Sequence, residues 1–157
     1  MKINTDLITW NSKLACGIKL IDEQHKGLVD LVNEMFNHIT SDAIQEKNYF
    51  KRVVEEVAQY VKIHFATEEK IMRTTKFSGY AIHKKEHETF IRTIVSKVQD
   101  YEAEKRFTIS AFTRFLRDWI LSHIALMDKQ YFLHLREIAS RKADGKLSIT
   151  IDDVNNI

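Results

Sequence analysis

Five of the seven histidines and two carboxylates fall on apolar helical stripes, where a packed core ordinarily has leucine or valine. His64 and Glu68 are four residues apart, so both side chains leave the same face of one predicted helix. His83 and His87 repeat this spacing in the next predicted helix. The full set of inward-facing residues is His25, His64, Glu68, His83, His87, His123 and Asp128. Imidazoles and carboxylates that converge in this way predict a metal site.

His123 and Asp128 are five residues apart, which is a less regular helical spacing. They lie on neighbouring apolar rows of one predicted helix, so we expect both to face inward, about one turn apart along the helix axis. Glu69, one residue after Glu68, is expected to point outward or nearly so. His38 and His134 belong to no ligand-like pattern.

A single histidine in a core is more often a hydrogen-bonded structural residue than a metal ligand. The full set needs another explanation, because a buried carboxylate without a partner costs several kcal/mol. No lysine or arginine lies on the inward stripes to compensate Glu68 and Asp128. A bound cation accounts for the whole set.

The number and type of these residues predict the metal. Seven ligands are too many for one zinc ion, which takes about four. They suit two six-coordinate ions that share bridging carboxylates. Imidazole and carboxylate ligands suit iron, and the absence of thiolate from the set argues against copper(I) and iron–sulfur clusters.

Four amphipathic segments must position this site. Their apolar positions recur with helical spacing over residues 22–39, 45–72, 80–101 and 108–138. Short loops join them, and Asp22 is expected to cap the first helix. We therefore predict an all-α fold, an antiparallel up-down four-helix bundle.

The chain has 157 residues, no proline and only four glycines, which suits one domain of long helices. We expect residues 22–139 to form the bundle and residues 1–21 to form an N-terminal arm packed on it. Residues 140–157 are expected to be a short polar C-terminal tail, although KLSITI within them alternates like a strand.

Several classes of protein are not favoured by this sequence. The net charge is +2 and the basic residues are scattered, so we expect no nucleic-acid partner. No apolar run approaches the length of about 18 residues of a membrane span, and none resembles a signal peptide, so we expect a cytoplasmic protein without membrane partners. Cys16 is the only cysteine and is expected to be a small buried hydrophobe.

The sequence resembles the hemerythrins, specifically the single-domain bacterial members, over about residues 8–135. The resemblance rests on four motifs in order and at matching spacing, GIKLIDEQHKGL around His25, HFATEE from His64, HKKEH from His83 and HIALMD from His123. It implies an up-down bundle that holds a di-iron centre and binds O2 reversibly.

The resemblance also implies a ligand set for each of two iron ions. One ion would be held by His83, His87 and His123, the other by His25 and His64, and both would be bridged by Glu68, Asp128 and an oxo or hydroxo group. Counting ligands leaves one open position on the second ion, and in the family O2 binds there.

An apolar wall is expected beside the open position. Leu28, Val32, Trp119, Ile120 and Ile124 lie within about one helical turn of predicted ligands. They would exclude water and proton donors from bound O2. Ordinary core packing explains the same residues equally well.

Three functions remain open on the sequence alone. The first is an O2-binding protein for storage, delivery or scavenging. The second is a di-iron enzyme with peroxidase-like activity, although five neutral imidazoles and two carboxylates give less anionic ligation than the carboxylate-rich bundles that activate O2. The third is a sensor of O2 or iron, or an interaction module, whose protein partner the sequence does not identify.

Overall fold

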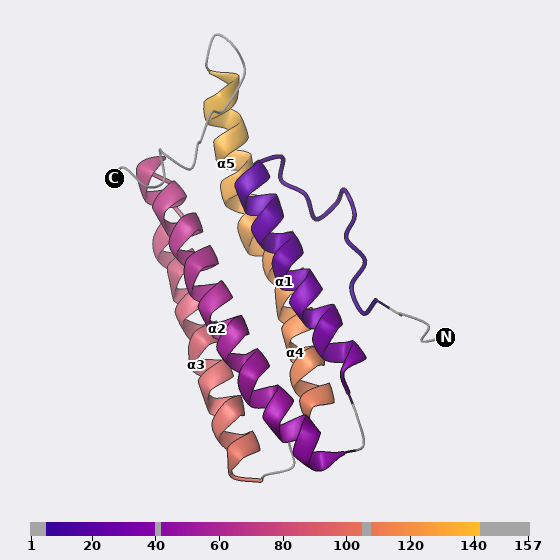
Figure 1. Ribbon diagram of the computed structural model, residues 1–157. Helices are drawn as coiled ribbons and strands as arrows, with labels where there is room; N and C mark the ends of the chain where they lie inside the picture. Colours follow the sequence, from indigo (N-terminus) through magenta and orange to yellow (C-terminus); the bar gives the residue numbers. More distant parts are fainter. Residues whose placement is uncertain (1–5, 40–41, 105–107, 142–157) are drawn as a thin grey trace.

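Four antiparallel helical rods make up the protein in a computed structural model, which describes residues 6–39, 42–104 and 108–141 (Figure 1). No strand occurs in these residues. The helices are α1 (Lys19–Asn37), α2 (Ala43–Thr74), α3 (Tyr80–Glu102), α4 (Ile109–Ser122), the π-helix η1 (His123–Asp128) and α5 (Lys129–Ser140). The last three follow one another without a break and form the fourth rod (Figure 1). The predicted all-α, antiparallel up-down bundle is confirmed.

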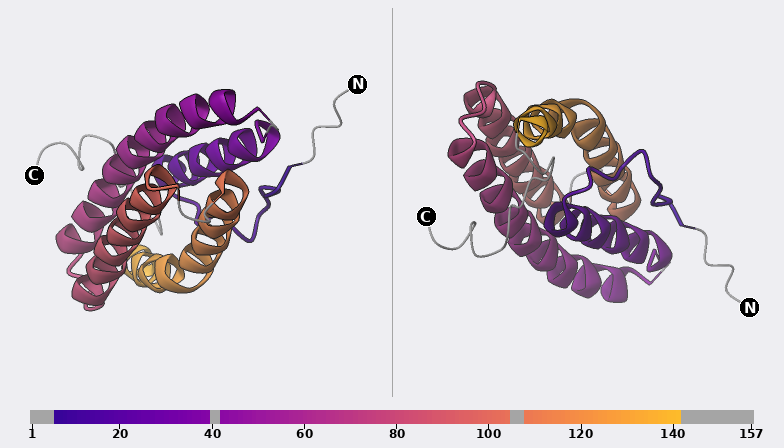
Figure 2. Two further views of the ribbon diagram at one scale, coloured as in Figure 1. Left: turned by 90° about the horizontal axis from the view of Figure 1, so that it is seen from below. Right: turned by 90° about the horizontal axis from the view of Figure 1, so that it is seen from above.

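Viewed along its length, the bundle has α1 beside α2 and α4, and α3 beside α2 (Figure 2). Short connections place α1 beside α2 and α2 beside α3, and the return of the fourth rod brings α4 against α1. Side chains at the starts of two helices accept hydrogen bonds from backbone N–H groups that have no partner within the helix. The Asp42 carboxylate accepts from the backbone N–H of Ile44 and Gln45 at the start of α2, and the Thr108 hydroxyl accepts from that of Ala111 in α4.

The predicted capping role of Asp22 is wrong. Helix α1 begins at Lys19, so Asp22 lies within its first turn. Its carboxylate instead accepts hydrogen bonds from the backbone N–H groups of Cys16 and Gly17, at 2.7 and 3.1 Å. Gly17 has a φ of +87°, a left-handed conformation that favours glycine. Asp22 therefore anchors the N-terminal segment as it turns into the helix.

The fourth rod was expected to be one regular α-helix, and this is also wrong. Its backbone is π-helical over His123–Asp128. Hydrogen bonds in a π-helix join residues five apart, so His123 and Asp128 lie on the same face instead of on neighbouring rows. A π-helical turn holds more residues than an α-helical turn, so a separation of five residues brings both side chains to one face.

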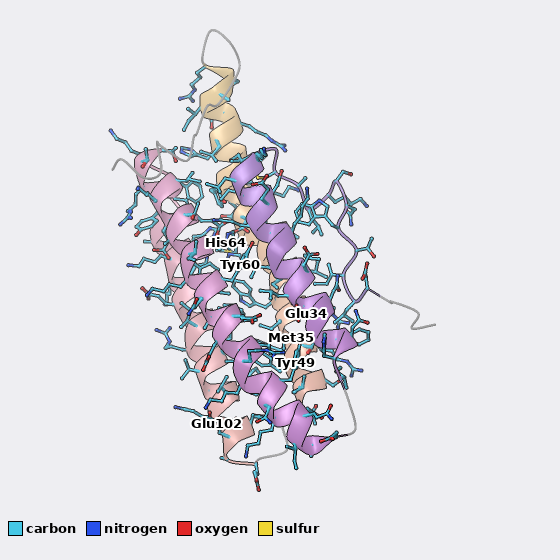
Figure 3. All side chains as sticks on the ribbon, in the orientation of Figure 1. Glu34, Met35, Tyr49, Tyr60, His64 and Glu102 are labelled. Atoms are coloured by element: carbon cyan, nitrogen blue, oxygen red, sulfur yellow. The ribbon has the colours of Figure 1, made fainter. Side chains whose placement is uncertain are left out.

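Two apolar clusters fill the interior, and the predicted metal-site residues lie between them. On α1, His25 lies between Ile21 of the smaller cluster and Leu28 of the larger one. Figure 3 shows His64 toward one end of the bundle and Tyr49, in the larger cluster, toward the other. The site is therefore off-centre and closed by packed side chains above and below.

The N-terminal segment packs on the bundle where it is described. Ile8 and Leu14 are buried in the larger cluster. The backbone of Ile8 exchanges two hydrogen bonds of 2.9 Å with the side-chain amide of Asn33. Most of the predicted polar tail, including the strand-like KLSITI, lies outside the described residues, and the division into arm, bundle and tail stays a prediction.

None of the helices described is both long and apolar enough to cross a lipid bilayer.

Candidate metal centre

The seven predicted ligands come together in the interior from α1, α2, α3 and η1. All seven are at most 5% exposed. They form two overlapping groups, in each of which one ligand atom per residue lies within 4.8 Å of all the others. The larger group is Glu68, His83, His87, His123 and Asp128, and the smaller is His25, His64, Glu68 and Asp128. The two carboxylates belong to both groups.

Asp128 divides its two oxygens between the groups. Its Oδ1 lies 3.0 Å from the Nε2 atoms of both His83 and His123. Its Oδ2 lies 3.2 Å from Nε2 of His25. Asp128 therefore turns one oxygen toward each group.

Glu68 is the second shared carboxylate. Its Oε2 lies 3.5 Å from Nε2 of His64 and 3.3 Å from Nε2 of His87, so it too faces both groups. The other oxygen, Oε1, accepts a hydrogen bond of 2.6 Å from the phenol of Tyr131. Tyr131 therefore fixes the orientation of the carboxylate.

Three imidazole nitrogens of the larger group face one another at short distances. Nε2 of His123 lies 3.1 Å from that of His83 and 3.2 Å from that of His87. Donors at right angles around one ion, each about 2.1 Å from it, are about 3.0 Å apart. The observed spacing therefore matches three ligands of a single metal ion.

Unpaired polar atoms support the same conclusion. Among the described residues, the atoms buried without a hydrogen-bond partner include Nε2 of His25, Oε2 of Glu68 and both carboxylate oxygens of Asp128. Unpaired buried polar atoms are costly, and neither carboxylate forms an ion pair with a lysine or arginine of the described residues. The residues present fit metal binding by nitrogen and oxygen donors.

Two polar side chains hold the outer nitrogens of ligand histidines. The Nδ1 of His64 lies 2.9 Å from Oε1 of Gln24, and that of His87 lies 3.1 Å from Oε1 of Glu69. Because oxygen of this kind accepts, each Nδ1 carries the proton and each Nε2 presents a lone pair to the site. The outward orientation predicted for Glu69 is therefore wrong, since its position on α2 brings it against α3.

In the metal-free protein, burial and neighbouring ligands shift the pKa values of these groups in different directions. Burial disfavours the carboxylate of Glu68, but His64, His25 and His87 hold its pKa well below the usual value. Burial lowers the pKa of His64 to about 4, so this imidazole is neutral at pH 7. Burial also opposes the charged form of His25, but Asp128 and Glu68 raise its pKa to about 9.

Aromatic rings stack on two of the predicted ligand imidazoles. Phe65 stacks on His87 with ring centroids 3.7 Å apart and an interplanar angle of 3°. Trp119 stacks on His123 at 4.2 Å and 16°. Each ring removes rotational freedom from its histidine and excludes water from that side of the site.

The five predicted wall residues divide between two places. Leu28, Val32, Trp119 and Ile120 line a small apolar cavity of about 10 Å³, and Trp119 connects it to the site by stacking on His123. Ile124 lines a different, wider groove of about 410 Å³ between the N-terminal segment and α5. Four of the five thus share one cavity, and Ile124 does not.

The two remaining histidines lie away from the cluster, as the sequence indicated. His38 stacks on Tyr49, with its Nδ1 2.8 Å from the carbonyl oxygen of Glu34. His134 lies with its Nε2 2.8 Å from the carbonyl oxygen of Thr75. Both have local structural contacts of their own.

Sequence reasoning missed Gln24, Glu69 and Tyr131. The signal for Tyr131 was available, because it lies three residues after Asp128 and so faces the same side of its rod. Gln24 and Glu69 are each adjacent in sequence to a predicted ligand, a position that gives no indication of an inward contact.

Comparisons with known proteins agree with this geometry. The sequence profile of the Hemerythrin HHE cation binding domain matches residues 16–135. Bacteriohemerythrin of Pseudomonas aeruginosa is 31% identical over 144 residues, with 88% of this chain and 90% of that protein covered. Bacteriohemerythrin of Methylococcus capsulatus is 29% identical over 126 residues, with 80% of this chain and 94% of that protein covered. A crystal structure of a leucine-to-alanine mutant of hemerythrin superimposes with a TM-score of 0.73 at 27% identity, covering 83% of this chain and 98% of that one.

Proposed function

Because the chain belongs to the hemerythrin family, we propose that it binds O2 reversibly at a non-haem di-iron centre. The observation that carries this proposal is the sharing of Glu68 and Asp128 by two groups of buried imidazoles. One group would hold one iron and the other group the second, with the two carboxylates as bridges. The iron pair would supply the electrons on which reversible binding of O2 depends.

The two groups differ in the number of imidazoles they offer. The larger group has His83, His87 and His123, whereas the smaller has only His25 and His64. The smaller group therefore provides one protein donor fewer. We infer that the free position for O2 lies on this side, because an open position on a metal ion is where an exogenous ligand binds.

The chain's own residues then have distinct tasks. Tyr131 holds Glu68 in its bridging orientation through the 2.6 Å hydrogen bond. Gln24 and Glu69 keep the imidazoles of His64 and His87 turned so that their Nε2 lone pairs face the centre. The apolar cavity beside the site keeps water and proton donors away from bound O2.

A carrier fits the site better than an enzyme. Five neutral imidazoles and two carboxylates supply little negative charge, so the oxidised states needed to attack a substrate would be weakly stabilised. We therefore propose O2 storage, delivery or scavenging as the role, with any peroxidase-like turnover a side reaction.

The test uses the iron-loaded protein, reduced anaerobically and then exposed to O2. An absorption band of the oxygenated form should appear, persist and disappear again when O2 is removed. Direct oxidation without such a band would contradict reversible binding. Rapid turnover of an added peroxidase substrate, at a rate comparable with O2 uptake, would favour the enzyme instead.

A further inference from the structure

Each group of predicted ligands contains one imidazole whose outer nitrogen has a hydrogen-bond partner, and the two partners differ in charge. His64, in the smaller group, has the neutral amide of Gln24 at 2.9 Å. His87, in the larger group, has the carboxylate of Glu69 at 3.1 Å. The two metal positions are therefore surrounded unequally beyond their ligands.

The amide of Gln24 is held in one orientation by a chain of hydrogen bonds. The Thr67 hydroxyl donates to the carbonyl of Ile63 at 2.9 Å, so its oxygen is left to accept. It accepts from Nε2 of Gln24 at 3.1 Å, which turns the Gln24 carbonyl oxygen toward His64. The imidazole of His64 thus donates to a neutral acceptor.

Glu69 supplies a full negative charge at the equivalent place. A carboxylate can only accept, so Nδ1 of His87 must donate to it. The side chain of Glu69 is 19% exposed, and among the described residues it forms no ion pair with a lysine or arginine. Its charge therefore acts on His87 without a competing cation.

The outer nitrogens of His25 and His83 do not offset this difference. The Nδ1 atoms of His25 and His83 are buried without a partner among the described residues. Each group thus has one imidazole of this kind, His25 in the smaller and His83 in the larger. The unequal surroundings come from Gln24 and Glu69.

We propose that Gln24 and Glu69 separate the electron affinities of the two metal positions, so that the position beside His64 is reduced before the one beside His87. An anionic acceptor on Nδ1 makes an imidazole a stronger donor to the metal and stabilises the more oxidised ion. A neutral amide does so less. This inference rests on the proposed di-iron function, and it makes Gln24 and Glu69 positioning residues that tune the site through His64 and His87.

The test compares the parent with Gln24→Glu and Glu69→Gln, each loaded with iron and titrated anaerobically by spectroelectrochemistry. Gln24→Glu should shift the higher of the two reduction potentials downward. Glu69→Gln should shift the lower potential upward. In either variant the two potentials should move closer together, and the half-reduced form should be less populated than in the parent.

Two exposed positions provide controls for a general change of charge. Glu86→Gln and Gln99→Glu alter the same residue types on the surface of α3 and should leave the separation of the potentials as in the parent. Glu69→Asp retains the negative charge and should keep the lower potential closer to the parent value than Glu69→Gln does. A purely structural role of Glu69 would not distinguish these two variants.

The outcomes separate this proposal from the proposed function. A parent protein with two irons, and an unchanged separation of potentials in both variants, would overturn the redox proposal alone. A parent that does not bind two irons would overturn the di-iron function itself. If Glu69→Gln loses iron, Gln24→Glu decides, because a higher potential that stays at the parent value contradicts the proposal.

Discussion

The phenol of Tyr131 donates a hydrogen bond of 2.6 Å to Oε1 of Glu68, and both side chains are fully buried. Burial, together with the negative charge of Glu68, raises the pKa of Tyr131 well above its usual value, so the phenol keeps its proton. The contact links α5 to α2 at the candidate metal centre. It also leaves Oε2 of Glu68 as the oxygen that faces His64 and His87.

Replacing Tyr131 by phenylalanine should therefore weaken both the fold and the site. The buried Oε1 of Glu68 would lose its donor, which costs about 1–3 kcal/mol in the metal-free protein. Iron affinity should fall as well, because the bridging carboxylate is no longer oriented. Urea unfolding of the metal-free protein and iron analysis after dialysis measure the two effects.

Tyr49→Phe is the matched control for this change. The hydroxyl of Tyr49 is buried without a hydrogen-bond partner among the described residues. Its removal should leave stability unchanged or slightly increased, since no interaction is lost and an unpaired polar atom disappears. Equal stabilities of Tyr131→Phe and Tyr49→Phe would show that the Tyr131 contact contributes nothing.

Glu68→Gln should disrupt the assembly of two irons per chain. A neutral amide bridges poorly and leaves the charge of the metal ions under-compensated. We expect the parent to bind two irons and Glu68→Gln to bind fewer, as measured by metal analysis. His38→Gln and His134→Gln should both retain two irons, and loss of iron in either would mean that the ligand set is wrong.

Shortening Ile120 to alanine should enlarge the apolar cavity beside the site, which Ile120 lines. The lost methyl groups should cost roughly 2–5 kcal/mol of stability, while iron content is retained. Water would reach the site more easily, so the oxygenated band should decay faster than in the parent at matched pH. The lifetime of that band after addition of O2 is the measurement.

Ile94→Ala separates this effect from general destabilisation. Ile94 is 6% exposed and belongs to the larger apolar cluster, but it does not line the cavity. It should lose a similar amount of stability without a change in the lifetime of the oxygenated form. Equal lifetimes in Ile120→Ala and the parent would remove Ile120 from the proposed wall.

The metal-free protein should be most stable near pH 6.5, because two histidines titrate in opposite directions. The pKa of His25 is raised from 6.5 to about 9, so its contribution is complete below 6.5 and is lost as the pH rises through about 9. The pKa of His64 is lowered to about 4, so its contribution is present above 6.5 and is lost as the pH falls toward 4. Free energies of unfolding measured across this range test the prediction.

His25→Gln should remove the alkaline part of this profile and leave the acidic part. The amide cannot take up a proton, so the decrease in stability between pH 6.5 and 9, roughly 3 kcal/mol for the parent, should shrink. A profile with the same alkaline slope in parent and variant would exclude His25 as its source.

The fold class followed from the sequence because helical periodicity is a local property. A side chain's place on a helix face depends only on its spacing from neighbours along the chain, so His64 with Glu68, and His83 with His87, were paired from their numbers alone. The cost of burying Glu68 and Asp128 without counter-ions then predicted a metal site, and the structure brings all seven predicted ligands together.

Other features depend on contacts between helices, which spacing does not encode. The backbone of residues 123–128 forms π-helical instead of α-helical hydrogen bonds, which aligns His123 with Asp128. Packing of the fourth rod against the other helices determines which pattern forms. Glu69 was expected to face outward from its position on α2, yet α3 lies close enough for it to reach His87.

The sequence by itself thus determined which residues face the interior and which chemistry they support, since burial and charge follow from residue type and helical period. Only the tertiary structure decided which side chains form hydrogen bonds with these interior residues. Gln24 reaches His64 across 40 positions of the chain, and Tyr131 reaches Glu68 across 63. Such pairs form because packing brings distant helices into register, and a hydrogen bond requires a few tenths of an ångström of accuracy that no local pattern specifies.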